Sequence, residues 1–417
     1  MSLVVMKFGG SSVGTVERMK HVAQRIVDKK QQGHQCVVVV SAMGDTTDEL
    51  IDLSRQLNER PPAREMDMLL TTGEQVSVAL LSMAIHALGH EAVSYTGWQV
   101  GMITDGTHGK ARIKDIKAHK IREALAKGNI VIVAGFQGMT EDQEITTLGR
   151  GGSDTTAVAL AAAIGADLCE IYTDVDGVYS TDPRIVRKAR KLNEISYDEM
   201  LELAFLGAAV LHPRAVEYAK HYKVRLVVRS SFTNHEGTLV KEEAVMEQGA
   251  AVRGIAYDKN VAKISILGAE DRPGVLAKVF TALAEEKIDV DVIVQSGVKD
   301  GRADFSFTVS GADLEKAVEV VKGLKGEFDF EDVRSESGLV KVSIVGAGMV
   351  STPGVAAKMF DTIYRQGVSI QMVSTSEIKV SCIVSGENLT EIILALHSAF
   401  GLDASTEAFV GGPKERR

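Results

Sequence analysis

Over the first 240 or so positions, hydrophobic residues form short unbroken runs that alternate with amphipathic stretches. The runs have the length of strands and are rich in Val and Ile, whereas the amphipathic stretches repeat their apolar residues at helical spacing. Strands are predicted in LVVMKFGG, QCVVVVSAMG, NIVIVAGFQG, LCEIYTDV and VRLVVRSS, the last of which closes the series. Helices are predicted in TVERMKHVAQRIVDKKQQG, TTDELIDLSRQLN and SDTTAVALAAAIGA.

The first predicted helix carries both of its end signals. Thr15 is a predicted N-cap and Gly33 a predicted stop. Between them, one helical stripe contains Val16, Met19, Val22, Ala23, Ile26 and Val27. This stripe predicts a helix packed on one side against a core.

Apolar strands separated by helices predict an α/β fold: a mainly parallel sheet covered by helices on both faces. In such sheets, ligands bind beyond the carboxyl ends of the strands. The glycine-rich and charged stretches of this chain follow strands or precede helices, so we expect them to gather at that edge.

The second half of the chain contains a tandem repeat. AKISILGAEDRPGVLAKVF (Ala262–Phe280) matches VKVSIVGAGMVSTPGVAAKMF (Val340–Phe360) after a two-residue insertion, and IDVDVIVQS matches VSIQMVSTS. Each copy of roughly 80 residues reads strand, Pro-Gly turn, helix, strand, strand, helix. This pattern predicts two small α+β, ferredoxin-like domains, each with a four-stranded antiparallel sheet. The repeat fits either a structural duplication or a pair of small-ligand sensors.

Four segments follow from these patterns: an α/β body at 1–245, a connecting segment at 246–261, and the two repeats at 262–337 and 338–410. Within the connecting segment, AAVRGIAYD is a predicted strand that joins the second repeat, which is short of one.

Composition narrows the class of protein. The 417-residue chain is 45% hydrophobic with a net charge of -9, which argues against nucleic acid as the main partner. No apolar run is expected to span a membrane and no signal peptide is predicted, so a cytoplasmic protein is expected. The scattered Cys36, Cys169 and Cys382 predict reduced, buried thiols.

The first strand places Lys7 at the mouth of a glycine turn, in the segment KFGGSS. Glycine lets backbone N–H groups crowd an anion, and lysine adds a point charge for phosphate, so this segment predicts a phosphate-binding loop. It is neither a Walker motif nor a G-x-G-x-x-G turn. GSSVG also matches the G-x-S-x-G hydrolase elbow around Ser12, and an ordinary strand-to-helix turn is a third possibility. The elbow ranks below the phosphate loop, because only one short strand precedes it and it leaves Lys7 unexplained.

The string TTLGRGGSDTTA, with Arg150 among its glycines, is more specific than either glycine motif alone. Its glycines allow the backbone to approach a neighbouring group closely. Ser153 or Asp154, which follow them, is a predicted helix cap. Capping does not explain Arg150 between glycines. A guanidinium there suits a carboxylate, which it binds through two parallel hydrogen bonds.

Three further segments carry weaker signals. YTDVDGVYSTDPR follows a strand but lacks the calcium-loop spacing, so Asp176 is interpreted as part of a surface turn, whereas Tyr179 suits a nucleotide base. SAMGDTTDEL and TTGEQVS add hydroxyls and Glu74. His212, in VLHPRA, is interpreted as a packing residue, and no metal-binding spacing of histidines occurs.

Taken in order, KFGGSS, SAMGDTTDEL, TTGEQVS, TTLGRGGSDTTA, YTDVDGVYSTDPR and the two repeats resemble the aspartate kinases of the amino-acid kinase superfamily, along essentially the whole chain. The repeats look like ACT regulatory domains. The resemblance implies transfer of the ATP γ-phosphoryl group to the β-carboxylate of L-aspartate, with Mg²⁺, at the first step of lysine, threonine and methionine biosynthesis. A carboxylate is already an anionic nucleophile near neutral pH, so this chemistry needs positioning and charge neutralisation and no general base.

The resemblance also implies roles for residues. Lys7 would offset phosphoryl charge, Asp154 would order Lys7 or a magnesium ion, Arg150 would hold the substrate α-carboxylate and Glu74 its ammonium. The other implied substrate residues are Ser41, Thr47, Phe136, Gly151, Gly152 and Ser153. The implied nucleotide residues, besides Lys7, are Phe8, Gly9, Gly10, Ser11, Thr173, Asp174, Tyr179 and Arg184. No protein-only metal site is implied.

Regulation is implied as well. Lysine, threonine or both are the expected inhibitors, with a homo-oligomer formed through the ACT domains. The candidate effector residues are Asp271, Gly274, Val275, Ala277 and Gln295 in the first repeat and Ile370, Ser376 and Glu377 in the second. Met246 would be an internal start for a separate regulatory chain, or an ordinary linker residue. Ala209 stands where many relatives carry a nucleotide-contacting lysine. A kinase for a glutamate-type substrate and an inactive amino-acid sensor are the alternatives.

Overall fold

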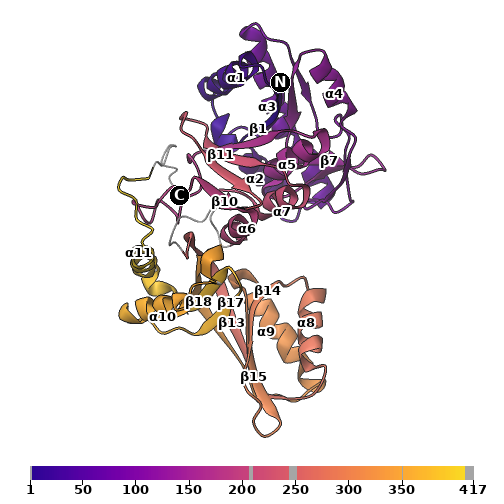
Figure 1. Cartoon of the computed structure of the whole chain (residues 1–417). Helices are drawn as coiled ribbons and strands as arrows, with labels where there is room; N and C mark the ends of the chain where they lie inside the picture. The colour runs from indigo at the N-terminus through magenta and orange to yellow at the C-terminus, as the bar shows by residue number, and fades with distance from the viewer. Residues whose placement is uncertain (1, 206–209, 244–250, 350, 409–417) are drawn as a thin grey trace. The chain divides into compact units, whose positions relative to one another are not determined.

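The computed structural model describes residues 2–205, 210–243, 251–349 and 351–408 (Figure 1). The chain divides into two compact units. The first unit comprises residues 1–247 and 404–417, and the second comprises residues 248–403. Ala209 and Met246, singled out in the sequence, lie outside the described residues.

The first unit is built on an eight-stranded sheet with the order β10-β12-β11-β9-β1-β2-β6-β3. Neighbouring strands run parallel except β11 and β12, which are antiparallel. The strands are β1 (Leu3–Phe8), β2 (Gln35–Val40), β3 (Ala92–Tyr95), β6 (Ile130–Ala134), β9 (Leu168–Thr173), β10 (Glu194–Ser196), β11 (Leu226–Ser230) and β12 (Thr238–Lys241).

Helices cover both faces of this sheet, as the sequence predicts. On one face, α1 and α3 bury apolar residues against β1, β2 and β6. On the other face, α4 and α5 pack against β6, β2, β1 and β9. The helices of this unit are α1 (Val16–Gln31), α2 (Thr46–Leu57), α3 (Ala63–Ala87), α4 (His119–Ala126), α5 (Gly152–Ile164), α6 (Tyr197–Phe205) and α7 (Pro213–Tyr222).

Local sequence signals place α1 well. The Thr15 side chain accepts a hydrogen bond from the Arg18 N–H, and the helix ends before Gly33, whose φ is 90°. The predicted apolar stripe is buried with one exception. Val16 is 58% exposed, because it lies in the first turn, where the helix has not yet reached the core.

Two strand predictions were wrong in extent. NIVIVAGFQG is not one strand: β6 ends at Ala134, the chain turns at Gly135 and Phe136, and Gln137 starts β7 in a different sheet. VRLVVRSS is not the last strand of its sheet, since β12 pairs antiparallel beside it. The first difference comes from the pairing of β7 with β8 in another sheet, and the second from the short antiparallel pairing of β12 with β11, and an apolar run encodes neither pairing.

A second, four-stranded sheet with the order β5-β4-β7-β8 was not foreseen. Its strands have three or four residues each, too short for a clear alternation of apolar and polar positions. They are β4 (Met102–Thr104), β5 (Ile113–Ile116), β7 (Gln137–Met139) and β8 (Ile145–Thr147).

Helix α3 is long and apolar enough to cross a membrane by length and composition alone, contrary to the expectation that no such segment exists. In this fold it packs against α1, α2, β3, β6 and β8. It also carries two buried carboxylates, Asp67 and Glu74. These contacts are those of a core helix.

The second unit contains both repeats in the predicted element order. Its sheet runs β14-β15-β13-β16-β18-β17 and is entirely antiparallel. The strands are β13 (Gly254–Glu270), β14 (Val290–Gln295), β15 (Arg302–Ser310), β16 (Asp332–Val345), β17 (Met372–Thr375) and β18 (Lys379–Ser385). The helices are α8 (Val275–Glu285), α9 (Leu314–Gly323), α10 (Val355–Arg365) and α11 (Leu389–Ala399).

The two long strands β13 and β16 connect the repeats. The first residues of β13, Gly254–Asp258, pair with residues 341–345 of β16, and residues 261–267 pair with residues 332–339. The start of β13 therefore extends the sheet of the second repeat, where β16 also pairs with β18. In the first repeat, α8 and α9 lie side by side over β13 and β15 (Figure 1).

The second unit ends earlier than the expected boundary at residue 410. From Ala404 the chain belongs to the first unit, where the Ala404 N–H donates to the Lys188 carbonyl and the Ala408 N–H donates to that of Arg187. A tail of this kind leaves no periodic pattern in the sequence.

Candidate active site

Lys7 lies at the centre of the main sheet. Its backbone pairs with Val39 of β2 on one side and with Ile171 of β9 on the other. The Lys7 Nζ lies 2.6 Å from Oδ1 of Asp154, in the first turn of α5, and each of these side chains is only 12% exposed. The ammonium is therefore held where the parallel strands end and a helix begins.

The loop after β1 is closely packed. Gly10–Ser12 form a 3₁₀ turn, and the Gly44 N–H donates to the Gly10 carbonyl over 3.1 Å. A Cβ atom on Gly10 would lie 2.8 Å from the Ala42 carbonyl oxygen, so only glycine fits here. At Gly9 a Cβ atom would lie 3.5 Å from the Lys7 Nζ. Backbone amides and the ammonium thus share one small space.

The hydrolase-elbow alternative does not fit this geometry. A nucleophile elbow exposes its serine, but Ser12 is buried and its Oγ is hydrogen-bonded to the Ser231 Oγ over 2.5 Å. Phe8 is likewise a core residue, with its ring stacked on Tyr172 at a centroid distance of 4.6 Å. Any contact of Phe8 with a ligand must therefore come from its backbone.

Glu74 is a buried carboxylate with an unused oxygen. It lies on α3, is 3% exposed, and its Oε1 accepts the Ala42 N–H over 3.0 Å. Among the described residues, no hydrogen-bond partner reaches Oε2. Burial raises the pKa of Glu74 to about 7, against the smaller opposing effect of the Ala42 N–H. A free buried carboxylate oxygen suits a cationic ligand group.

Ser41, Thr47 and Glu74 belong to neighbouring elements. The Ser41 N–H donates to the Phe8 carbonyl just after β2, and Thr47 lies in the first turn of α2. Gly73 of α3 lies against Ala42, since a Cβ atom there would come within 2.8 Å of the Ala42 Cβ. Three of the predicted substrate residues therefore surround the junction of β2, α2 and α3.

The turn between β6 and β7 adds Phe136, which is strained. Its φ of 70° is left-handed, a conformation that costs a bulky residue about 1–3 kcal/mol. The turn is held by the Phe136 N–H, which donates to Thr156 Oγ1, and by its carbonyl, which accepts from Leu148. A Cβ atom on Gly152 would lie 2.9 Å from the Phe136 ring, so this turn packs directly on the start of α5.

The loop before α5 carries the exposed Arg150. Gly149 and Gly151 on either side have φ values of 76° and 67°. Gly151 is the residue that precedes the first turn, so Ser153 and Asp154 lie inside α5 and neither caps it, contrary to the prediction. Gly151 takes the cap position because glycine adopts the left-handed conformation at low cost.

A Gly151→Ala substitution should be severely damaging. Its Cβ atom would lie 2.1 Å from the His212 ring, in addition to the unfavourable positive φ. We expect a fall in melting temperature of several degrees and at least a tenfold loss of kcat/KM. The matched control is Gly165→Ala at the other end of α5, where φ is 68° but no atom lies within 4 Å. Equal melting temperatures and activities for the two variants would contradict the packing argument.

At the end of β9 the candidate nucleotide residues separate into two groups. Thr173 Oγ1 donates to Asp174, and Arg184 is exposed with its Nε 3.3 Å from Asp182. Tyr179, by contrast, is buried, with its hydroxyl donating to Asp176 over 2.5 Å. The surface-turn interpretation of Asp176 was wrong: this residue is 4% exposed and also faces Lys191 and His235.

His212 and the cysteines take the expected structural roles. The His212 Nδ1 accepts the Arg214 N–H at the start of α7, and burial lowers the pKa of the imidazole. The three thiols are buried and free, and burial raises the pKa of Cys36 to about 11 and that of Cys382 to about 12. None of these cysteines is suited to be a nucleophile.

The sequence interpretation missed Asp67. This buried residue of α3 accepts hydrogen bonds from the Thr147 hydroxyl at 2.5 Å, the Gly109 N–H and the His108 Nδ1. It thereby fixes the end of β8, two residues before Gly149. A signal was present, because Asp67 lies seven residues before Glu74, on the same buried face of an otherwise apolar helix.

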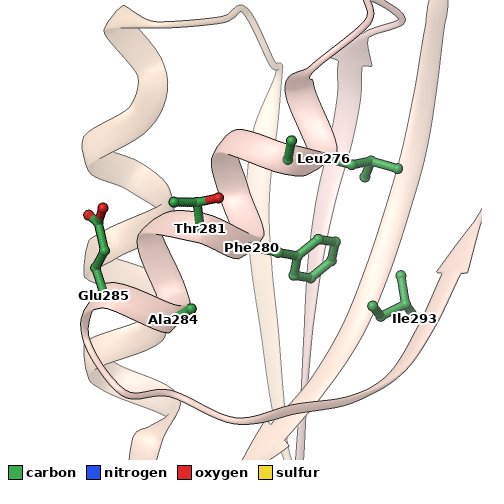
Figure 2. Close-up of a pocket in the computed structure, with 7 residues that line it drawn as sticks. Leu276, Phe280, Thr281, Ala284, Glu285 and Ile293 are labelled. Carbon is green, nitrogen blue, oxygen red and sulfur yellow. The ribbon is translucent and has the colours of Figure 1, made fainter.

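In the second unit, a pocket of about 340 Å³ collects most of the first repeat's effector candidates. Its lining includes Asp271, Gly274, Val275 and Gln295, at the Pro-Gly turn and the end of β14. Ala277 lies elsewhere, in an apolar groove of about 740 Å³ between α8 and β14. There Phe280 points from α8 toward Ile293 (Figure 2). In the second repeat, Ile370 precedes β17, and Ser376 and Glu377 follow it.

Comparisons with known proteins agree with this arrangement. Residues 2–230 match the model of the amino acid kinase family, and residues 264–326 and 342–400 each match an ACT domain. The chain is 56% identical to aspartokinase 2 of Bacillus subtilis, over 98% of this chain and all of that protein. Two crystal structures of E. coli aspartokinase III share 27% sequence identity with this chain. Each match covers 95% of this chain and 99% of the E. coli chain. The complex with aspartate and ADP has a TM-score of 0.81, and the complex with lysine and aspartate has a TM-score of 0.73.

Proposed function

Because this chain belongs to the aspartokinases of the amino acid kinase family, with two ACT domains after the kinase domain, we propose that it transfers the γ-phosphoryl group of ATP to the β-carboxylate of L-aspartate with the residues described above. The observation that carries the proposal is the Lys7–Asp154 pair beside the Gly9–Gly10 amides, at the carboxyl edge of a parallel sheet.

On the phosphate side, Lys7 neutralises charge on the transferring group, and the backbone amides of residues 8–11 bind phosphate oxygens. Asp154 holds the Lys7 ammonium in place, which keeps that cation oriented before ATP arrives. Thr173, Asp174, Tyr179 and Arg184 form the nucleoside side, with the buried Tyr179 fixed by Asp176. Catalysis then consists of positioning and charge neutralisation.

On the amino-acid side, Glu74 binds the substrate ammonium through its unpartnered Oε2, and Arg150 binds the α-carboxylate. Ser41, Thr47 and Phe136, together with residues 151–153, line the pocket around the side chain. A zwitterion fits a site with one buried anion and one exposed cation. The β-carboxylate attacks directly, since it is ionised at neutral pH.

Magnesium fits the donor chemistry of this site. Mg²⁺ prefers oxygen ligands and is usually bound through substrate phosphates and one or two carboxylates. Asp154, whose carboxylate lies beside the proposed phosphate position, is the residue that would hold it. A bound Mg²⁺ would neutralise phosphate charge alongside Lys7.

The test of the proposal is an ADP-release assay with purified protein and Mg·ATP. Aspartate should support turnover, and glutamate or no acceptor should not. Turnover with glutamate alone would favour the other amino-acid kinases, and no turnover with either would favour an amino-acid sensor. We further propose a cytoplasmic homo-oligomer inhibited by lysine, threonine or both.

For the regulatory unit we propose that the first repeat binds the inhibitor in the pocket of Asp271 and Gln295. Substituting Gln295→Leu removes an amide from the pocket wall, so we expect the inhibitor concentration for half inhibition to rise at least tenfold, with uninhibited kcat unchanged. The matched control is Thr375→Leu, at the corresponding position of the second repeat. A larger effect of Thr375→Leu would move the sensing site to the second repeat.

A further inference from the structure

Arg214, in the first turn of α7, joins two loops that are distant in sequence. Its Nη1 donates to the carbonyl of Leu148 over 2.7 Å, and its Nη2 donates to the carbonyl of Ala111 over 2.9 Å. Leu148 and Ala111 are both fully buried. A single planar guanidinium thus satisfies two buried carbonyl groups, a geometry that a lysine ammonium cannot reproduce.

The two carbonyls belong to segments that already lie against each other. The Ala111 N–H donates to the Thr147 carbonyl over 2.9 Å. Two residues after Thr147, a Cβ atom at Gly149 would lie 2.9 Å from the Gly109 carbonyl oxygen. Residues 109–111 therefore pack directly against residues 147–149. Arg214 connects these two segments through its hydrogen bonds to one carbonyl of each.

The start of α7 touches the same loop at a second point. The His212 ring lies against Gly151 so closely that no side chain fits there, and its Nδ1 accepts the N–H of Arg214 over 3.3 Å. The exposed Arg150 lies between these contacts, flanked by glycines with little conformational preference of their own. Packing of α5 against α7 continues the contact beyond the loop (Figure 1).

We propose that Arg214 is a positioning residue, which holds the Gly149–Gly152 loop so that Arg150 can bind the α-carboxylate of the substrate. This inference rests on the proposed role of Arg150. The Arg214 side chain acts through two backbone carbonyls and does not touch substrate. Without it, residues 148–151 must be ordered when the substrate binds, and the conformational entropy lost then weakens affinity. Lys7 and the loop after β1 are outside these contacts, so ATP binding is spared.

The experiment uses the full-length protein with Arg214→Ala, Arg214→Lys and a matched control, Arg122→Ala. Arg122, on α4, also donates from its guanidinium to a backbone carbonyl, that of Ala163. This hydrogen bond is exposed and lies at the C-terminal end of α5, away from the loop before that helix. For Arg214→Ala we expect the KM for aspartate to rise about tenfold or more and the KM for ATP to change less than twofold. Arg214→Lys should restore part of the loss, and Arg122→Ala should change neither constant.

A double-mutant cycle with Arg150→Ala separates this inference from the proposed function. If Arg214 acts through Arg150, its effect on the KM for aspartate should largely disappear in the Arg150→Ala background. An Arg150→Ala variant with an unchanged KM would overturn the proposed role of Arg150. An effect of Arg214→Ala that persists in that background, falls equally on both substrates, or is absent in folded protein would overturn the inference alone.

Discussion

Replacement of Lys7 with methionine should reduce kcat on the order of a thousandfold while leaving the protein folded. In other enzymes, removal of one preorganised hydrogen-bond donor from a site where negative charge develops lowers kcat by about 10²–10³. Lys7 also carries a full positive charge, so we expect an effect at the upper end of this range. The pair it forms with Asp154 is almost closed to solvent, so water cannot replace the ammonium effectively. The measurement is the steady-state kcat with saturating Mg·ATP and aspartate.

The control for Lys7→Met must separate chemistry from stability, because the substitution leaves Asp154 without its cation. Lys29→Met is the matched control, because it also removes a lysine from a buried carboxylate. Lys29 lies on α1 in the same unit, and its Nζ lies 3.0 Å from a carboxylate oxygen of the fully buried Glu170 side chain. We expect Lys29→Met to lower the melting temperature and to retain kcat within a fewfold. A folded Lys7→Met protein that turns over at the parental rate would refute the catalytic role of Lys7.

The sequence predicted β1, β2, β6, β9 and β11 of the main sheet because these strands are largely apolar on both faces, whereas the short strands β3, β10 and β12 were not predicted. β1, β2, β6 and β9 are buried along nearly their whole length, and that burial is what makes unbroken runs of Val and Ile. The end of each strand then placed the glycine-rich and charged loops at one edge of the sheet. The pairing of Lys7 with Asp154 was implied only by the resemblance to the aspartate kinases, and the structure places their charged groups 2.6 Å apart.

Details set by non-local contacts were not predictable. The turn at Phe136 depends on its left-handed φ and on a hydrogen bond to Thr156, 20 residues further along the chain, and neither leaves a mark in NIVIVAGFQG. Asp176 resembled a surface residue because turn formers surround it, whereas its partners Lys191 and His235 come from other segments. Arg214 was overlooked for the same reason: its carbonyl partners lie more than 60 residues upstream.

Glu74 gives the second prediction, which concerns pH. With the pKa of Glu74 at about 7, the carboxyl in the free protein changes from mostly protonated at pH 6 to mostly ionised at pH 8. Only the ionised form attracts an ammonium group, so a proton must be released when aspartate binds below pH 7. We expect the KM for aspartate to be about tenfold higher at pH 6 than at pH 8, at saturating Mg·ATP.

The Glu74→Gln variant should remove that dependence while raising the KM for aspartate at pH 8 by about 10- to 100-fold, the loss of one charge-assisted hydrogen bond in a buried site. Its KM should then be nearly flat between pH 6 and pH 8. A wild-type KM that does not vary over this range, or a variant that keeps the wild-type slope, would show that another group binds the ammonium.

Stability should move in the opposite direction from affinity. Burial raises the pKa of Glu74, so the folded state resists ionisation of this carboxyl. The contribution of the protonated Glu74 to folding stability is therefore fully present below the unfolded-state pKa near 4.5, and it is lost as the pH rises through 7. Glu74→Gln removes this loss. Its melting temperature should therefore exceed that of the wild type by a few degrees at pH 8, and the difference should shrink at pH 5. Such a gain would identify Glu74 as a buried charge that is retained for substrate binding at the expense of folding stability, whereas a variant less stable than wild type at pH 8 would show that the charge supports the fold.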